Sequence, residues 1–246
     1  MTAKNIGLLQ SKTVMAFLQA RMGSTRLPGK VLMPIHGQSI LERAIRRLQA
    51  SPSVNAVAVL TTCRSVDDVI IEESRRLGAL VYRGPEQDVL TRFYEAAEVF
   101  HPDIIIRATA DNPLIDIGSI ERIIMTLYFN NLDWCMEKDL PYGAATEAFT
   151  AEALSRVHLM AKEAPHREHV TLFIKEHPEI FRSYLLDPPR SLCHPEIRVT
   201  VDTSEDFDCV NQLIGKLPED KQPRPLSDYL FVALNNLDER ECKAFT

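Results

Sequence analysis

The chain of 246 residues carries a formal net charge of −6 at pH 7, and 45% of its residues are hydrophobic. This length suffices for one large domain with a sizeable core, and the acidic balance argues against a broad nucleic-acid-binding surface. No apolar run approaches the roughly twenty residues that span a bilayer. Five cysteines are scattered without a C-x-x-C pair, as is typical of reduced thiols. We therefore expect a cytoplasmic protein that binds neither nucleic acid nor membrane.

Apolar runs alternate with amphipathic stretches through the first half of the chain. Ser39 stands where the cap of the first predicted helix belongs. This alternation favours an α/β fold, with an open and mostly parallel sheet covered by helices on both faces. Strands are predicted at 14–18, 54–60, 79–82 and 103–107, and helices at 40–48, 66–77, 88–100 and 117–128.

The second half of the chain is less regular, although nothing in it demands a separate domain. Three prolines between 218 and 225 predict a linker into a last amphipathic helix. Strands are predicted at 133–136, 147–149, 181–186 and 197–201, and helices at 151–160, 167–175, 205–214 and 227–237.

The predicted organisation has three parts. Residues 1–13 form a disordered tail, because their apolar patch is too short for a signal peptide or an anchor. Residues 14–217 form the main domain. Residues 218–246 form a linker and a helix that packs on the body of the protein or on a partner.

The segment QARMGSTRLPGK, residues 19–30, follows the first predicted strand. Glycines can aim backbone N–H groups at a ligand without a Cβ in the way, and Arg21, Arg26 and Lys30 add positive charge. The alternative is a glycine turn with solvated cations. Three cations and a Pro-Gly pair are more than a turn requires, so the segment predicts a loop that binds a polyphosphate.

The spacing of this loop excludes two common phosphate sites. A Walker A loop has four residues between its glycine and its Gly-Lys pair and then a Ser or Thr, whereas five residues separate Gly23 from Gly29 and Val31 follows Lys30. No G-x-G-x-x-G follows the first strand, so the dinucleotide fingerprint is absent too. The loop predicts a phosphate site of another class, for a small molecule.

Polar residues directly after predicted strands are the next candidates, because ligands of such sheets bind at the carboxyl ends of strands. Asp111 and Asp202 occupy two of these ends and would supply the carboxylates that Mg²⁺ prefers. Asp111 is also suited to a turn before Asn112-Pro113, and the run after Asp202 is a good helix cap. Thr61 could bond a base or ribose or could cap its strand.

Five segments in order resemble the cytidylyltransferase family that activates acidic sugars, over roughly residues 14–215. The closest match is the branch named after spore-coat polysaccharide biosynthesis protein F. The segments are QARMGSTRLPGK, RGPEQDVLTRFYEAA (83–97), RATADNPLID (107–116), REHVT (167–171) and VTVDTSEDFD (199–208).

This resemblance implies a Rossmann-like, three-layer nucleotidyltransferase fold with a mostly parallel mixed sheet. It implies a homodimer that uses CTP and Mg²⁺. A sugar or sugar-acid hydroxyl attacks the α-phosphate and releases pyrophosphate, for surface polysaccharide or glycan biosynthesis. By position, the resemblance implies catalytic roles for Arg21, Lys30 and Asp111, metal binding by Asp111 and Asp202, and nucleotide binding by Ala20, Arg21, Met22, Gly23, Ser24, Arg26, Lys30, Thr61, Arg83, Asp88, Arg92 and Ala110.

One segment departs from the branch. Residues 141–149, which should face the acceptor, lack an aspartate that the branch has near Ala145. Two rival functions therefore stay open: a nucleotide-sugar glycosyltransferase of similar fold, and a nucleotide-binding protein without catalysis. The first usually has a D-x-D metal motif, and Ala110-Asp111-Asn112-Pro113 offers one aspartate. Retention of the loop cations and of both aspartates argues against the second.

Overall fold

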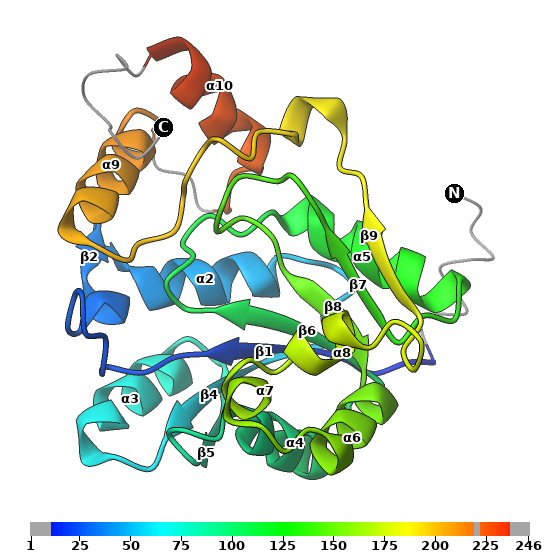
Figure 1. Ribbon diagram of the computed structural model, residues 1–246. Coiled ribbons are helices and arrows are strands. Elements are labelled where there is room, and N and C mark those ends of the chain that lie inside the picture. The colour runs from blue at the N-terminus through cyan, green and yellow to red at the C-terminus, as the bar shows by residue number, and fades with distance from the viewer. Residues whose placement is uncertain (1–10, 219–221, 237–246) are drawn as a thin grey trace.

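The computed structural model describes residues 11–218 and 222–236, which build a seven-stranded mixed sheet between layers of helices (Figure 1). The strand order is β5-β4-β1-β6-β8-β7-β9. β8 runs antiparallel to both neighbours, and the other four adjacent pairs are parallel. The predicted three-layer α/β fold is confirmed. The strands are β1 (Val14–Gln19), β4 (Ala56–Thr62), β5 (Leu80–Gly84), β6 (Ile104–Thr109), β7 (Trp134–Glu137), β8 (Glu147–Thr150) and β9 (Ser183–Leu186).

The helices also fall close to their predicted positions. The Ser39 side chain accepts a hydrogen bond from the backbone N–H of Glu42 and caps its helix as expected. Thr203 and Asp206 form a reciprocal capping box at another helix. The helices are α2 (Ile40–Gln49), α3 (Asp68–Arg76), α4 (Val89–Phe100), α5 (Ile117–Phe129), α6 (Ala151–Met160), α7 (Ala164–Glu168), α8 (Leu172–Glu176), α9 (Ser204–Gly215) and α10 (Leu226–Asn236).

The alternation of side chains along β1 divides the core between the two faces of the sheet. Ala16 and Leu18 face a cluster that includes the apolar sides of α2 and α5. Met15 and Phe17 face the opposite cluster, which includes α4, α6 and α8. Both faces of β1 are buried, which explains its continuous apolar sequence.

A third apolar cluster supports the C-terminal part of the chain. α9 and α10 pack there against Ile197, Val199 and Val201, with Leu226 and Leu230 of α10 fully buried. The last helix therefore packs on the body of the protein. Residues 219–221 and 237–246, including the predicted helix end at Leu237, lie outside the described residues.

Two element predictions are wrong. The range 197–201 forms no strand: its alternating apolar residues are buried in the third cluster, and only an isolated bridge joins Arg198 to Tyr142. The range 167–175 is not one helix, because the chain leaves helical geometry at His169, which separates α7 from α8. Apolar periodicity indicates burial in both segments without fixing the backbone conformation.

The N-terminal residues and the cysteines add two details. Lys12 and Thr13, which were predicted to belong to the tail, both hydrogen-bond to Asp103, and residues 1–10 lie outside the described part. Cys63, Cys135 and Cys193 are free thiols, but Cys209 is disulfide-bonded. The expectation of a reduced thiol is therefore wrong at this position, because sequence spacing does not report which sulfurs meet in space.

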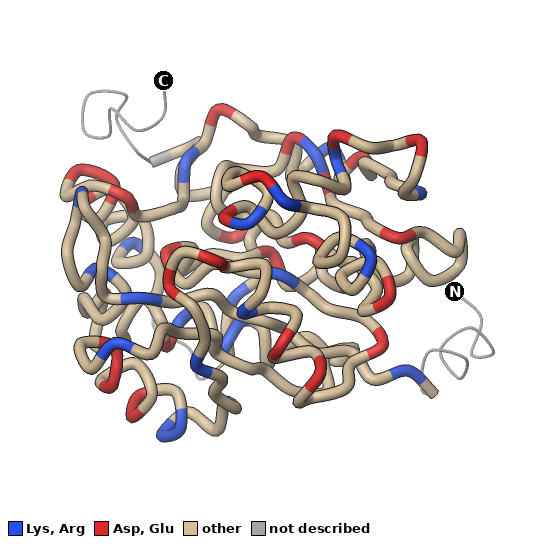
Figure 2. The backbone as a smooth tube through the Cα atoms, turned by 60° about the horizontal axis from the view of Figure 1, so that its bottom comes forward, with Lys and Arg blue, Asp and Glu red and all other residues tan. Residues whose placement is uncertain are grey.

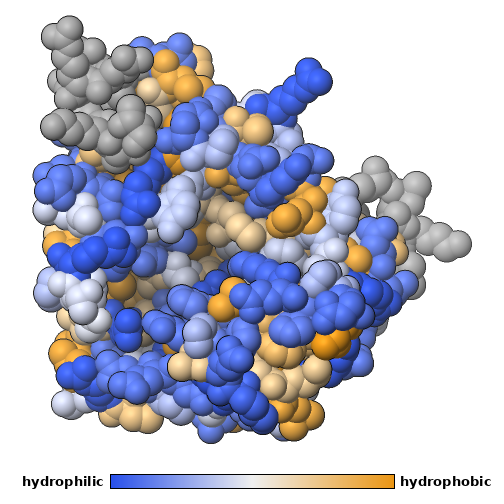
Figure 3. All heavy atoms as spheres, viewed as in Figure 1, coloured by the Kyte–Doolittle hydropathy of each residue, from blue (hydrophilic) through white to orange (hydrophobic). Residues whose placement is uncertain are grey.

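Charged residues of both signs are spread along the chain. Lys and Arg are interspersed with Asp and Glu along the tube in Figure 2, so no side of that view carries one sign of charge alone. Among the helices of the described ranges, none is both long and apolar enough to cross a membrane. The space-filling view in Figure 3 shows a hollow near the middle of the face seen in Figure 1.

Candidate active site

The loop after β1 is folded back on itself and tied to neighbouring strands. The backbone N–H of Gly29 donates to the carbonyl of Met22 at 3.1 Å, and Gly29 has φ of 72°, a left-handed conformation that favours glycine. Ser24 donates to the same carbonyl at 2.9 Å. Within the described residues, the N–H groups of Arg21 and Gly23 have no hydrogen-bond partner. Both remain available to an anion.

Asp67 anchors this loop, a role that sequence reasoning missed. Its carboxylate accepts a hydrogen bond from the backbone N–H of Met22 at 2.8 Å and another from the hydroxyl of Thr62 at the end of β4. Asp67 is 1% exposed. A buried acid before a helix resembles an ordinary helix-start residue in the sequence, so only the fold reveals its contact with a loop 45 residues away.

Lys30 joins the loop to both predicted metal ligands. Its Nζ donates to Asp111 Oδ2 at 2.9 Å, to Asp202 Oδ1 at 2.8 Å and to the carbonyl of Val201 at 2.7 Å. Lys30 begins the short 3₁₀ helix η1 (Lys30–Leu32), and its side chain is 9% exposed. Three predicted site residues, far apart in sequence, therefore meet at one atom.

The backbone brings the two aspartates together. The N–H of Val201 donates to the carbonyl of Asp111 at 2.9 Å, so Asp202 follows directly after a tie to Asp111. Asp111 lies after β6 on the turn to α5, whereas Asp202 precedes the capping box of α9. The segment that fails to form the predicted strand at 197–201 thus positions the second carboxylate.

Three cations surround Asp202. Besides Lys30, Arg26 contacts its Oδ1 at 2.9 Å and Arg198 contacts its Oδ2 at 2.7 Å. Burial raises the pKa of Asp202, but the ammonium of Lys30 and the guanidinium groups lower it further, so its pKa lies below the ordinary value. Arg198 also binds Asp206 at 2.8 Å. Arg198 was absent from the predicted site.

The donor set fits Mg²⁺. Oδ2 of Asp111 and Oδ1 of Asp202 share Lys30 Nζ as a partner, and only one of the two carboxylate oxygens of Asp111 is engaged within the described residues. These residues hold no group of three or more His, Cys, Asp or Glu that could bind a metal. Mg²⁺ typically takes one or two carboxylates and completes its shell with phosphate oxygens and water, so the pair is a suitable incomplete set.

Two adjoining cavities meet at these aspartates. One, of about 220 Å³, lies against the loop, and the other, of about 580 Å³, extends toward the 139–147 segment. They share four lining residues: Arg26, Thr109, Asp111 and Asp202. We call them the loop cavity and the distal cavity. The shared aspartates stand where the contents of the two cavities would meet.

The loop cavity collects much of the predicted nucleotide site. Gln19, which the predicted site omitted, also lines it, and its buried Oε1 has no hydrogen-bond partner. The signal for Gln19 was its place at the carboxyl end of β1. The predicted residues that line the loop cavity are Ala20, Arg21, Ser24, Arg26, Lys30, Ala110, Asp111 and Asp202.

Six of the residues predicted to bind the nucleotide line neither cavity, and their roles remain predictions: Met22, Gly23, Thr61, Arg83, Asp88 and Arg92. Thr61 is fully buried in β4. Arg83 donates to backbone carbonyls of Thr62 and Arg64, and Arg92 donates to those of Pro85 and Glu86. Asp88 caps α4 and pairs with Arg167 at 2.6 Å.

The distal cavity is lined by several charged residues, most of which are paired. Glu137 is buried and bound by Arg122 at 2.5 Å. Glu147 accepts hydrogen bonds from Lys175 Nζ at 2.5 Å and from the Thr171 hydroxyl at 2.6 Å. At the rim stands Tyr142, 59% exposed, whose ring lies 4.7 Å from the guanidinium carbon of Arg198.

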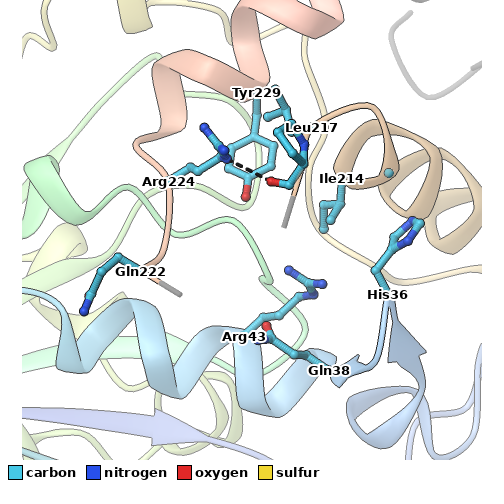
Figure 4. A pocket seen from close by; sticks show the side chains of 10 residues that line it. His36, Gln38, Arg43, Ile214, Leu217, Gln222, Arg224 and Tyr229 are labelled. Atoms are coloured by element: carbon cyan, nitrogen blue, oxygen red, sulfur yellow. Dashed lines mark hydrogen bonds between the residues drawn. The ribbon is translucent and has the colours of Figure 1, made fainter. Parts of the chain in front are cut away.

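A third cavity, of about 320 Å³, lies apart from both and shares no lining residue with them. Figure 4 shows its basic side chains, with Arg43 projecting from α2 and Arg224 from the segment before α10. Arg43 donates to the carbonyl of Ile35 at 2.6 Å, and Arg224 donates to that of Pro218 at 3.2 Å. Arg43 thus ties α2 to the segment before it, and Arg224 ties the segment before α10 to the chain that follows α9.

Comparison with known proteins agrees with this geometry. A family model described as Cytidylyltransferase matches residues 15–239. An uncharacterized protein of Methanocaldococcus jannaschii, MJ1063, is 41% identical over 194 residues, which cover 79% of this chain and 80% of that protein. Spore coat polysaccharide biosynthesis protein SpsF of Bacillus subtilis is 33% identical over 227 residues, covering 90% and 94%. The structure of a cytidylyltransferase from Leptospira borgpetersenii superposes with a TM-score of 0.86 at 29% identity, over 94% of this chain and 97% of that one.

Proposed function

Since the chain belongs to the cytidylyltransferase family, a family of CTP-dependent nucleotidyltransferases, we propose that it transfers CMP from CTP to a hydroxyl of a sugar or sugar acid and releases pyrophosphate. The observation that carries this proposal is the convergence of Lys30, Asp111 and Asp202 where the loop and distal cavities join. The triphosphate would lie in the loop cavity and the acceptor in the distal cavity.

The loop supplies charge and donors to the triphosphate. Arg21 is exposed, lines the loop cavity and forms no ion pair within the described residues, so its guanidinium is available to phosphate oxygens. The free N–H groups of Arg21 and Gly23 lie on the same loop and would add donors in fixed positions. Placing donors beforehand stabilises the charge that develops on the phosphates during transfer.

Asp111 and Asp202 would hold Mg²⁺, which supplies charge neutralisation at the phosphates when it is bound. In the protein alone, the ammonium of Lys30 fills the space between the two carboxylates and keeps them from repelling each other. We infer that Lys30 turns toward the phosphates once the carboxylates have another partner. The retained carboxylates and cations support an active enzyme over a binding protein without catalysis.

The proposal extends to the kind of acceptor and to the place where it binds. The distal cavity is large enough for a monosaccharide, and Tyr142 offers an exposed ring at its rim. The relative in Bacillus subtilis is named for spore-coat polysaccharide biosynthesis, which supports an acceptor destined for a glycan.

A transfer assay tests the proposal. The protein is incubated with each of the four NTPs, Mg²⁺ and a panel of neutral and acidic sugars, while pyrophosphate release and product mass are followed. We expect CTP to be consumed and a CMP-sugar to form with at least one acceptor. Absence of CMP transfer across the panel, together with no CTP-induced rise in melting temperature, would overturn the proposal.

A further inference from the structure

The least satisfied cation of the distal cavity is Arg107, the fourth residue of β6. Its Nε is enclosed and has no hydrogen-bond partner. Its one polar contact among the described residues runs from NH1 to Glu147 at 3.5 Å, the outer limit of a hydrogen bond. A guanidinium has five N–H donors, and a half-buried one normally uses several of them.

Glu147 neutralises this arginine only in part, because it is shared with Lys175. Its carboxylate already accepts short hydrogen bonds from Lys175 and Thr171, so the cluster of Arg107, Lys175 and Glu147 carries one surplus positive charge. The other lining acids are engaged elsewhere: Glu137 by Arg122, and both aspartates of the junction by Lys30. Asp139 is the exception, but it is exposed to solvent, which screens its charge.

A second unsatisfied group borders the same cavity. The hydroxyl of Thr146 is buried and has no hydrogen-bond partner, although Thr146 is 1% exposed and lies next to Glu147 in the chain. An unpaired buried hydroxyl costs free energy unless a ligand bonds to it. A guanidinium whose Nε is unpaired and a hydroxyl without a partner are suited to bind an oxyanion.

We propose that Arg107 is the acceptor-recognition residue of this enzyme and binds an oxyanion group of the acceptor, with the Thr146 hydroxyl as a further donor. This inference rests on the proposed transfer of CMP. In this inference Arg107 determines which acceptor binds and takes no part in the chemical step. It holds the oxyanion away from the junction of the cavities, so that the attacking hydroxyl of the acceptor is directed toward the junction. Carboxylates and phosphates share this recognition chemistry, and the experiment separates them.

The test measures sugar binding to the full chain with Mg²⁺ and a CTP analogue whose α,β-bridge is a methylene group, so that no transfer occurs. Titration calorimetry compares D-glucuronate, 3-deoxy-D-manno-octulosonate and N-acetylneuraminate with D-glucose 6-phosphate and with neutral D-glucose. We expect at least one oxyanion-bearing sugar to bind. Arg107→Gln should weaken that binding by roughly a hundredfold, and Arg107→Lys by less. A preference for the sugar acids or for the phosphate identifies the oxyanion.

A second pair of variants tests the charge without touching Arg107. Ala145 lines the distal cavity and is partly exposed, so Ala145→Asp adds a carboxylate there while Ala145→Asn adds the same volume without charge. We expect the aspartate to weaken oxyanion binding at least tenfold more than the asparagine does. Both variants should bind the CTP analogue as the wild type does.

The outcomes separate this inference from the proposed function. Failure of the CTP analogue to bind the wild type contradicts the proposed function. Three results would overturn the role of Arg107 only, provided that the analogue binds normally. The first is unchanged sugar affinity in Arg107→Gln, and the second is binding of neutral sugar alone. The third is no binding of any oxyanion-bearing sugar up to 50 mM, about a fivefold excess over a 10 mM Kd.

Discussion

Lys30 lies with its ammonium nitrogen 2.9 Å from Oδ2 of Asp111, although 81 residues separate the two in the chain. The same nitrogen contacts Asp202, so it stands between two carboxylates that would otherwise repel each other. Removing a largely buried cation leaves its carboxylate partners without a counter-charge. The free-energy cost of this typically exceeds the stabilisation that the ion pair provides. Lys30 therefore has a structural role in the protein alone and a phosphate-binding role in the proposed reaction.

Lys30→Met tests both roles. We expect a loss of about 2–4 kcal/mol in the free energy of unfolding and a fall in kcat/KM for CTP of about a hundredfold or more. Mg²⁺ alone should raise the melting temperature of the variant more than that of the wild type, because the two carboxylates have lost their cation. The control is Lys12→Met, which removes an exposed ion pair with Asp103 far from the site. Equal Mg²⁺ effects on variant and wild type would contradict the shared role of the carboxylates.

Asp111→Asn separates metal binding from folding. The side chain of Asp111 contacts Lys30, whereas its structural tie to Val201 uses the backbone carbonyl, which the substitution leaves in place. We expect Mg²⁺-dependent turnover to fall by about a thousandfold, with little change in the melting temperature. Asp208→Asn, at an exposed position on α9, is the matched control. Full activity of Asp111→Asn would remove Asp111 from the metal site.

The sequence predicted the fold well where burial and backbone agree. β1 is a continuous apolar run, and α2 and α5 have clear apolar periodicity. Each of the three lies within one residue of its predicted range. The range 197–201 shows the limit. Its apolar residues are buried as expected and pack under α9 and α10, but its backbone pairs with single residues of two loops, Tyr142 and Asp111, rather than with a strand. Periodicity reports which side chains are buried and not which backbone groups find partners.

The same limit applies to the site. Lys30 was predicted from the cations of the loop, and Asp111 and Asp202 from their positions after predicted strands. The fold brings the three together. Asp67 and Arg198 were not predicted, since each acts through a contact that only the tertiary structure creates. Residues that touch a ligand leave a local signal in the sequence, whereas residues that position them do not.

Arg198→Met should produce a pH-dependent loss of stability. Burial raises the pKa values of Asp202 and Asp206, but cationic and hydrogen-bond partners lower them further, so both lie below their ordinary value in the folded state. A depressed carboxylate stabilises the fold above its unfolded pKa of about 3.9, and this contribution is lost as the pH falls through the folded pKa. The deficit of the variant should therefore be largest near pH 7, about 1–2 kcal/mol, and smaller near pH 3.

Urea unfolding of wild type and Arg198→Met checks this expectation. It is measured with a chelator present across pH 3–7, which runs from about one unit below the ordinary carboxylate pKa to neutrality. Chelation keeps metal binding from contributing. A deficit that stays constant with pH would show that Arg198 stabilises the protein through its packing on Tyr142 rather than through the two carboxylates.

Gly143→Ala should disturb the distal cavity through the backbone. Gly143 has φ of 98°, and a Cβ there would lie 2.7 Å from the backbone nitrogen and the Cβ of Thr200. We expect a loss of about 2–4 kcal/mol and a larger rise in KM for the acceptor than for CTP, because the clash displaces the 139–147 segment, which lines the distal cavity. Gly37→Ala is the matched control: φ is 78° there, but no atom lies within 4 Å of the added Cβ. It should cost only about 1 kcal/mol and leave both KM values unchanged.

Gln19→Met should lower nucleotide affinity without lowering stability. Oε1 of Gln19 is buried beside the loop cavity and accepts no hydrogen bond within the described residues, so replacing the amide with an apolar chain of similar length removes an unsatisfied group from the free protein. In the complex, the same oxygen would accept a hydrogen bond from the nucleotide, and its loss should raise the Kd of the CTP analogue about tenfold. Calorimetry and thermal unfolding of the same samples measure the two effects. A melting temperature at or above that of the wild type, combined with weaker binding, supports a ligand contact, whereas unchanged affinity contradicts it.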